Sequence, residues 1–141
     1  PDASCTRAQM ITFLWRAAGE PKAETRTCTF TDVDRSAYYY EALLWAIENG
    51  ITTGTGADAF SPDAACSRGQ MTAFLYRYAG TPKVNGKHSF SDVRTDAYYN
   101  DAVIWAAAEG ITKGTNNIAF SPDEDCTRGQ MVTFLYRYLA E

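Results

Sequence analysis

One stretch, residues 60–78 (FSPDAACSRGQMTAFLYRY), most constrains the fold, because it occurs again almost unchanged as residues 120–138 (FSPDEDCTRGQMVTFLYRY). Its back part also begins the chain, as residues 1–16 (PDASCTRAQMITFLWR). The copies lie about sixty residues apart, and recurrence at a fixed period is the signature of a repeat protein. We therefore expect the chain to be built from repeated supersecondary units.

Each copy contains the start signal of a helix. A hydroxyl residue stands three positions before a glutamine in every copy, which is the spacing of a capping box. After each cap, apolar residues follow at the positions i, i+3, i+4 and i+7 of a helix with one apolar face, as in Met71, Phe74, Leu75 and Tyr78. The pattern predicts helices over residues 6–18, 67–79 and 127–139.

A second type of helix is predicted over residues 37–49 and 97–109, where apolar or small residues cover most of the circumference. Each is preceded by an extended hook, Phe-x-Asp-Val, in which Asp32 and Asp92 are expected to accept hydrogen bonds from amides one or two residues further on. The chain is therefore predicted to be an all-α helical repeat domain, with about half of its residues in helices.

An arginine occupies the first helical position of every copy, at Arg7, Arg68 and Arg128. The helix dipole disfavours a cation there by roughly 0.3 to 1 kcal/mol, so each arginine needs a partner. One explanation is an Asp or a backbone carbonyl of a neighbouring repeat. The other is the capture of an anion, because an arginine fork beside free helix amides suits a carboxylate or a phosphate. Both explanations remain open at this point.

Composition excludes several classes of function. The 141 residues have a net charge of -4 with both signs interspersed, so neither a nucleic-acid partner nor membrane insertion is indicated. The only histidine, His88, lies in a polar linker and is expected to be solvated. The sequence Asp32-x-Asp34-x-Ser36 imitates a calcium loop, but Ala37 stands where glycine is required. We expect a protein that is not an enzyme and uses neither metal nor cofactor.

The four cysteines allow two hypotheses. Cys5, Cys66 and Cys126 precede the three caps at equivalent positions, and around a pseudo-threefold axis we expect them to lie on the outside, far apart. At most one disulfide is then expected, with Cys5 as the favoured mate of Cys28. The alternative is that the cysteines are buried free thiols that act as small apolar side chains.

The order of motifs resembles the S-layer homology repeat. The resemblance rests on residues 30–33, 38–46, 50–54, 60–62 and 67–70, and it recurs over residues 90–130, with its final part at residues 6–9. Some positions depart from the family pattern. Glutamine replaces the usual acidic residue at Gln9, Gln70 and Gln130, and tyrosine replaces the usual tryptophan at Tyr38 and Tyr98. The order of about a dozen matching positions identifies the fold despite these changes.

The resemblance implies a function. Members of the family attach secreted proteins to the Gram-positive cell wall through a secondary cell-wall polysaccharide, often pyruvylated, and three repeats form a pseudo-threefold spindle. The arginines would then meet the ketal carboxylate of the sugar. The glycan-binding residues implied are the arginines Arg7, Arg68 and Arg128, the capping residues Thr6, Ser67 and Thr127, and the aromatic residues Tyr38, Tyr98, Trp45 and Trp105. The alternative is a protein-binding or spacer module of a larger secreted surface protein or enzyme.

The repeat boundaries predict one domain over residues 1–141, in which residues 1–20 form the back half of a first repeat and residues 21–80 and 81–141 form two full repeats. The chain opens within a repeat, so we expect its start to be a cut or processed edge. We also expect an apolar trough beside Trp45 and Trp105, covered by upstream residues of the parent chain or by a second copy in a dimer.

Overall fold

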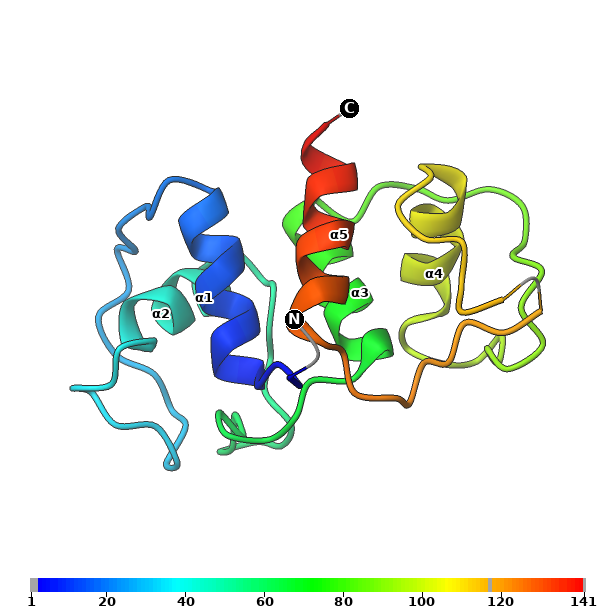
Figure 1. Cartoon of the computed structure of the whole chain (residues 1–141). Helices are drawn as coiled ribbons and strands as arrows, with labels where there is room; N and C mark the ends of the chain where they lie inside the picture. Colours follow the sequence, from blue (N-terminus) through cyan, green and yellow to red (C-terminus); the bar gives the residue numbers. More distant parts are fainter. Residues whose placement is uncertain (1–2, 117, 141) are drawn as a thin grey trace. The chain divides into compact units, whose positions relative to one another are not determined.

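The computed structural model describes residues 3–116 and 118–140. These residues form five helices and no strand: α1 (Arg7–Ala17), α2 (Tyr40–Glu48), α3 (Arg68–Tyr78), α4 (Asn100–Ala108) and α5 (Arg128–Leu139) (Figure 1). The all-α prediction is therefore confirmed for the described part of the chain. The helices contain 11, 9, 11, 9 and 12 residues, a little over a third of the chain and less than the predicted half. None of them is long and apolar enough to cross a membrane.

The chain divides into two compact units, which we describe separately. The smaller unit, residues 6–65, contains α1 and α2 packed against each other. The larger unit, residues 1–5 and 66–141, contains α3 packed against α4, together with α5. The single domain of residues 1–141, with its three repeat segments, stays a prediction.

The capping boxes start α1, α3 and α5 as predicted. In α1 the Thr6 hydroxyl accepts a hydrogen bond from the amide of Gln9 at 3.1 Å, and the Gln9 side chain accepts one from the amide of Thr6 at 2.9 Å. Ser67 and Thr127 make the same pair of bonds in the other two copies. Two amides at each helix start are thus satisfied by side chains three residues apart, which explains why the start could be located from the sequence.

The central helices α2 and α4 begin three residues later than predicted. The segment before α2 is a pair of tight turns, in which the amide of Ala37 donates to the carbonyl of Asp34 and the amide of Tyr40 donates to the carbonyl of Ala37. The Asp34 carboxylate accepts hydrogen bonds from the amide and the hydroxyl of Ser36 at 2.9 and 2.8 Å. Hydrogen bonds between residues three apart compete with the four-residue spacing of α-helical hydrogen bonds, so the regular helix starts only at Tyr40.

The hook aspartates have partners different from those predicted. Asp32 accepts from the amides of Phe60 and Ser61 at 3.0 and 2.8 Å, and Asp92 makes the equivalent bonds in the other repeat, both at 2.8 Å. The expectation of a local Asx turn is therefore wrong. Ser61 has a positive φ of 59°, so the carboxylate stabilises a strained turn. Burial alone would raise the pKa of Asp32, but its hydrogen bonds from the two amides bring the pKa below its ordinary value.

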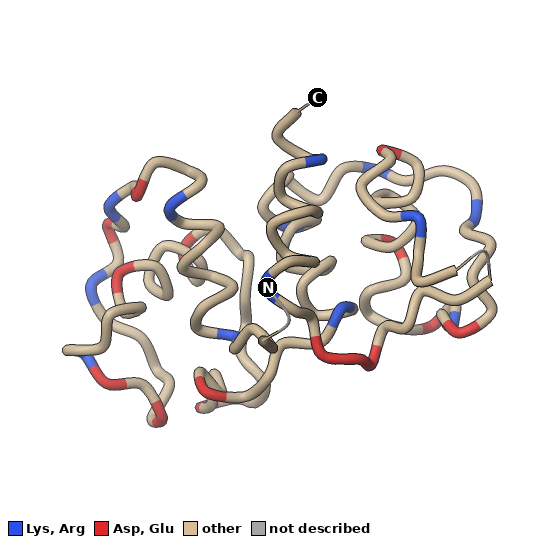
Figure 2. Tube along the Cα trace, in the orientation of Figure 1, with Lys and Arg blue, Asp and Glu red and all other residues tan. Residues whose placement is uncertain are grey.

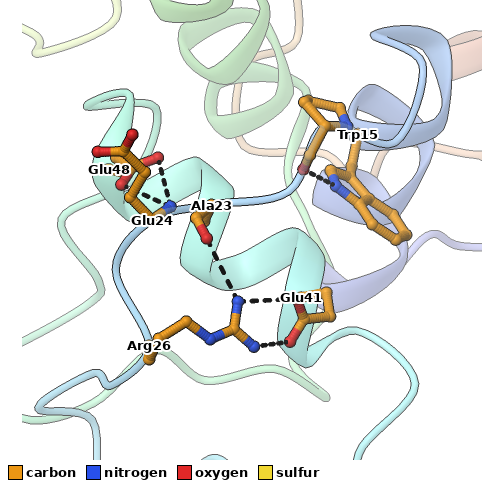
Figure 3. Close-up of polar contacts among 7 residues, drawn as sticks. Trp15, Ala23, Glu24, Arg26, Glu41 and Glu48 are labelled. Carbon is orange, nitrogen blue, oxygen red and sulfur yellow. Dashed lines mark hydrogen bonds and ion pairs between the residues drawn. The ribbon is translucent and has the colours of Figure 1, made fainter.

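Charged side chains of the smaller unit tie the linker after α1 to α2 (Figure 3). Arg26 makes a two-pronged ion pair with Glu41, with its shorter bond at 2.6 Å. Glu48 accepts from the amides of Glu24 and Thr25 at 3.0 and 2.9 Å. These contacts are solvent-exposed, so they position the linker and add little stability.

The corresponding linker of the larger unit uses neutral contacts. His88 Nδ1 accepts from the amide of Phe90 at 3.1 Å, and His88 Nε2 lies 3.0 Å from the side-chain oxygen of Asn100. The prediction that His88 is solvated is wrong, because both ring nitrogens have protein partners.

Apolar packing differs between α5 and the other capped helices. Trp45 and Trp105 are both only 6% exposed, so the predicted trough does not lie beside them. Three exposed apolar side chains lie on α5, where Val132, Tyr136 and Leu139 are 56%, 71% and 53% exposed. The α3 counterpart of Tyr136 is Tyr76, which is 9% exposed because it packs against Trp105 of α4 with ring centroids 5.6 Å apart.

The three cysteines before the caps lie side by side within the larger unit. The amide of Cys5 donates to the carbonyl of Cys126, that of Cys126 to Cys66, and that of Cys66 to Cys5, at 2.8, 2.7 and 2.7 Å. We call this closed set of bonds the cysteine ring. The prediction that these residues lie far apart is wrong, because backbone hydrogen bonds join the three segments that precede the caps. All four cysteines are free, so the predicted bond between Cys5 and Cys28 is absent. Burial raises the pKa of the Cys126 thiol to about 12.

Candidate anion-binding pocket

Arg68 is a buried cation at the start of α3. Its side chain is 3% exposed, and Nε donates to the carbonyl of Phe120 at 2.8 Å. The guanidinium lies over the Phe120 ring at 4.8 Å and over the Phe134 ring at 5.5 Å from the centroids. A backbone carbonyl, rather than a carboxylate, is therefore its internal partner. Burial lowers the pKa of Arg68, but an arginine remains charged at neutral pH even so.

The smaller unit repeats this arrangement. Arg7 is also 3% exposed, its Nε donates to the carbonyl of Phe60 at 2.9 Å, and its guanidinium lies 4.9 Å from the centre of the Phe60 ring. The Asp32 carboxylate accepts a hydrogen bond from the amide of Phe60. This bond positions the Phe60 carbonyl for Arg7. Arg128, at the equivalent position of α5, is exposed. The three arginines are thus equivalent in the sequence, but Arg128 differs from Arg7 and Arg68 in its exposure.

A pocket of about 760 Å³ opens beside Arg68 in the larger unit. Its walls come from Arg68, from the loop 112–115 and from one side of α5 between Thr127 and Arg137. Among the described residues that line it are three cations and no carboxylate, the cations being Arg68, Lys113 and Arg137. In a chain with a net charge of -4, such a pocket is a local concentration of positive charge that suits an anionic ligand.

Figure 2 shows the charges along the chain trace. The helix α5 contains two arginines and no acidic residue, whereas Asp123, Glu124 and Asp125 form an acidic segment in the loop before it. Glu124 acts on the Arg68 charge through space but does not line the pocket. The acidic segment and the basic pocket are therefore distinct features of the larger unit.

Two features fix the shape of the pocket wall. The Thr112 hydroxyl accepts from the amide of Gly114 at 3.1 Å, and Gly114 has a positive φ of 80°. A β carbon at Gly114 would lie 2.4 Å from the Phe90 ring, so the loop requires glycine. The second is a bond from Arg137 Nη1 to the carbonyl of Ile111 at 3.0 Å, which ties α5 to the start of the same loop.

The pocket brings together only some of the residues that the resemblance implied. Arg68 and Thr127 line it, and its aromatic wall is Phe134. Tyr98 and Trp105 are not among the lining residues: Trp105 is buried, and Tyr98 is 63% exposed with its ring edge-on to Tyr99 at 5.1 Å. The glycan-binding roles of all these residues stay predictions.

In the smaller unit, Tyr38 resembles Tyr98, since it is 63% exposed and its ring is edge-on to Tyr39 at 5.2 Å. The capping hydroxyls are engaged as acceptors at the helix starts, so any ligand would meet the hydroxyl proton or its remaining lone pair.

Sequence reasoning missed Lys113 and Arg137. Lys113 stands in the turn Ile-Thr-Lys-Gly, whose other copy, Ile51-Thr-Thr-Gly54, has Thr53 at the same position. A comparison of the two copies would have shown this charge, but its approach to α5 and Arg68 depends on tertiary structure.

Comparison with known proteins agrees with the repeats. The sequence profile of the S-layer homology domain matches residues 29–72 and 89–132. The chain is 30% identical over 145 residues to an amylopullulanase of Thermoanaerobacterium thermosulfurigenes, an alignment that covers 99% of this chain and 8% of the relative.

An endoglucanase of Bacillus sp. (strain KSM-635) is 29% identical over 121 residues, covering 86% of this chain and 13% of the relative. A surface-layer 125 kDa protein of Lysinibacillus sphaericus is 29% identical over 100 residues, an alignment that covers 71% of this chain and 8% of the relative. The chain thus spans only about a tenth of the length of these relatives. Since the two profile matches cover more than half of the chain, it belongs to the S-layer homology domain family, whose modules bind cell-wall polymers and associate proteins with the cell surface.

Proposed function

We propose that this chain anchors a secreted protein to the Gram-positive cell wall by binding a secondary cell-wall polysaccharide, and that the pocket beside Arg68 holds an anionic group of that polymer. The observation that supports this proposal is a cation that is 3% exposed and lines a pocket with no described carboxylate. A buried charge is costly unless it is paired, and the anion would supply the pairing. The ketal carboxylate of a pyruvylated sugar fits this requirement.

Polar and apolar groups around the pocket suit a sugar. Threonine hydroxyls and the side-chain amide of Gln130 provide neutral hydrogen-bonding groups, and the Phe134 ring provides an apolar wall. Ligand sites combine an apolar surface with a few placed polar groups in this way. The exposed rings of Tyr38 and Tyr98 offer further faces on which sugars of the same polymer could stack.

The pseudo-threefold spindle is part of the proposal. It is supported by the cysteine ring, in which equivalent residues of the three copies are joined by equivalent bonds. The proposal extends to a non-catalytic role, in which any enzyme activity of the parent protein would come from other parts of it.

Cosedimentation with purified walls tests the function. The chain should sediment with intact walls, should remain in solution after acid extraction has removed the secondary polysaccharide, and should be displaced by the extracted polymer. Mild removal of the pyruvyl groups should weaken binding as well. Binding that survives complete extraction would contradict the proposal and point to peptidoglycan or protein.

A second function, docking of another protein, is favoured by the exposed side of α5. Val132, Tyr136 and Leu139 lie at i, i+4 and i+7, so they form one apolar stripe. Upstream residues of a longer parent chain or a second copy in a dimer would cover such a stripe. Sedimentation equilibrium of the chain tests the dimer, and loss of self-association in Tyr136→Ser would locate it on α5. A monomer at all concentrations would exclude the second copy.

A further inference from the structure

We infer that the pocket of the larger unit selects ligands with at least two neighbouring negative groups, and that Lys113 and Arg137 determine this selectivity. The inference rests on the proposed function and names the chemistry of its ligand: a polyanionic stretch of glycan rather than a sugar with a single carboxylate.

The first argument is the number and origin of the cations. Arg68 comes from α3, Lys113 from the loop after α4, and Arg137 from the last turns of α5, so three different segments of the chain bring a positive charge to one pocket. None of the described lining residues is acidic. One bound carboxylate would leave two positive charges uncompensated, whereas two anionic groups would come closer to balancing the pocket.

The second argument is that the cations are held differently. Arg68 is buried and oriented by the Phe120 carbonyl, so it can meet only an anion that enters the pocket. Arg137 is partly buried, and its Nη1 is held by the carbonyl of Ile111 at 3.0 Å, which orients the rest of its planar fork. Lys113 is exposed on the loop. A ligand that reaches Arg68 and the other two cations must therefore extend across the pocket.

The third argument is the size of the pocket. Its volume of about 760 Å³ lies within the range of roughly 300 to 1,000 Å³ that holds a drug-sized ligand. A single carboxylate would occupy a small part of that space, and a short oligosaccharide would use more of it.

The test compares sugars that differ in charge number. Galacturonic acid, digalacturonate and trigalacturonate serve as probes with one, two and three carboxylates, and their affinities are measured by calorimetry at low salt. For the natural chain we expect affinity to rise about tenfold from the monomer to the dimer, because a second charge-assisted contact forms. Added salt should reduce the affinity for the dimer more than that for the monomer.

Two variants test which residues cause the rise in affinity from galacturonic acid to digalacturonate. Lys113→Thr introduces the residue of the other copy at an exposed position, so its melting temperature should match that of the natural chain. Lys113→Thr should reduce this rise in affinity by about threefold, because an exposed ion pair contributes an amount of that size to binding. Arg137→Gln should remove most of the tenfold gain, and Arg137→Lys, which retains the charge, should restore part of it. Equal affinity for all three probes, or an unchanged gain in Lys113→Thr and Arg137→Gln, would overturn the inference.

The wall assay separates this inference from the proposed function. If extraction of the polysaccharide abolishes wall binding but neither variant weakens it, the function stands and the inference fails. If extraction has no effect, the proposed function fails whatever the galacturonates show. Absence of binding to every galacturonate probe also overturns the inference.

Discussion

Replacement of Arg68 by alanine should both destabilise the protein and weaken wall binding. The change removes a hydrogen bond from a charged donor to the Phe120 carbonyl, worth about 1.5 to 3 kcal/mol. It also removes stacking over two phenylalanine rings, worth about 0.5 to 2 kcal/mol. Relief from burying a cation offsets part of this loss. We expect a net cost of about 1 to 3 kcal/mol in the free energy of unfolding.

The assay is urea denaturation, with Arg7→Ala and Arg128→Ala as matched variants. Arg7 donates to the Phe60 carbonyl and lies over the Phe60 ring, as Arg68 does with Phe120, so its replacement should cost a similar amount. Arg128 is exposed, so its replacement should change stability by no more than about 0.5 kcal/mol. If Arg68→Ala proves no less stable than Arg128→Ala, the structural role given to the buried guanidinium is wrong. If Arg68→Ala is destabilised but binds walls as tightly as the natural chain, the pocket beside it is not the glycan site.

Three further predictions concern other parts of the chain. Gly114→Ala should lower the free energy of unfolding by about 1 to 3 kcal/mol in urea titrations, because its β carbon would meet the Phe90 ring at 2.4 Å; unchanged stability would contradict the loop geometry. Tyr136→Ser should change stability by less than about 0.5 kcal/mol, whereas Tyr76→Ser should cost about 2 kcal/mol or more, since only the second tyrosine is buried; equal losses would contradict the difference between α5 and α3. Cys28 should react with iodoacetamide at pH 8 before the cysteines of the ring, which are fully buried, and peptide mass mapping of the folded protein would show the reverse order if the ring were accessible.

The sequence by itself determined the starts of the capped helices and the family. Each capping box joins residues only three positions apart, so the spacing of Thr6 and Gln9 contains all the information that its two hydrogen bonds need. The all-α class follows from the same local signals. The repeat pattern identified the family because many positions recur in a fixed order.

The starts of α2 and α4 were predicted less well, although the competing bonds are also local. Apolar periodicity indicates where a helix can bury a face, but it does not exclude a preceding tight turn. The bonds from Ser36 to the Asp34 carboxylate stabilise such a turn, and the first three residues predicted to be helical lie before α2.

Only the tertiary structure decided the partners of residues that lie far apart in the sequence. Asp32 holds amides 28 and 29 positions away, Arg68 donates to a carbonyl 52 positions away, and the cysteine ring joins three repeats. The pocket likewise depends on where the loop with Lys113 packs against α5. Helix starts form from neighbouring residues, whereas these contacts exist only after chain segments have packed, so no local pattern of residues specifies them.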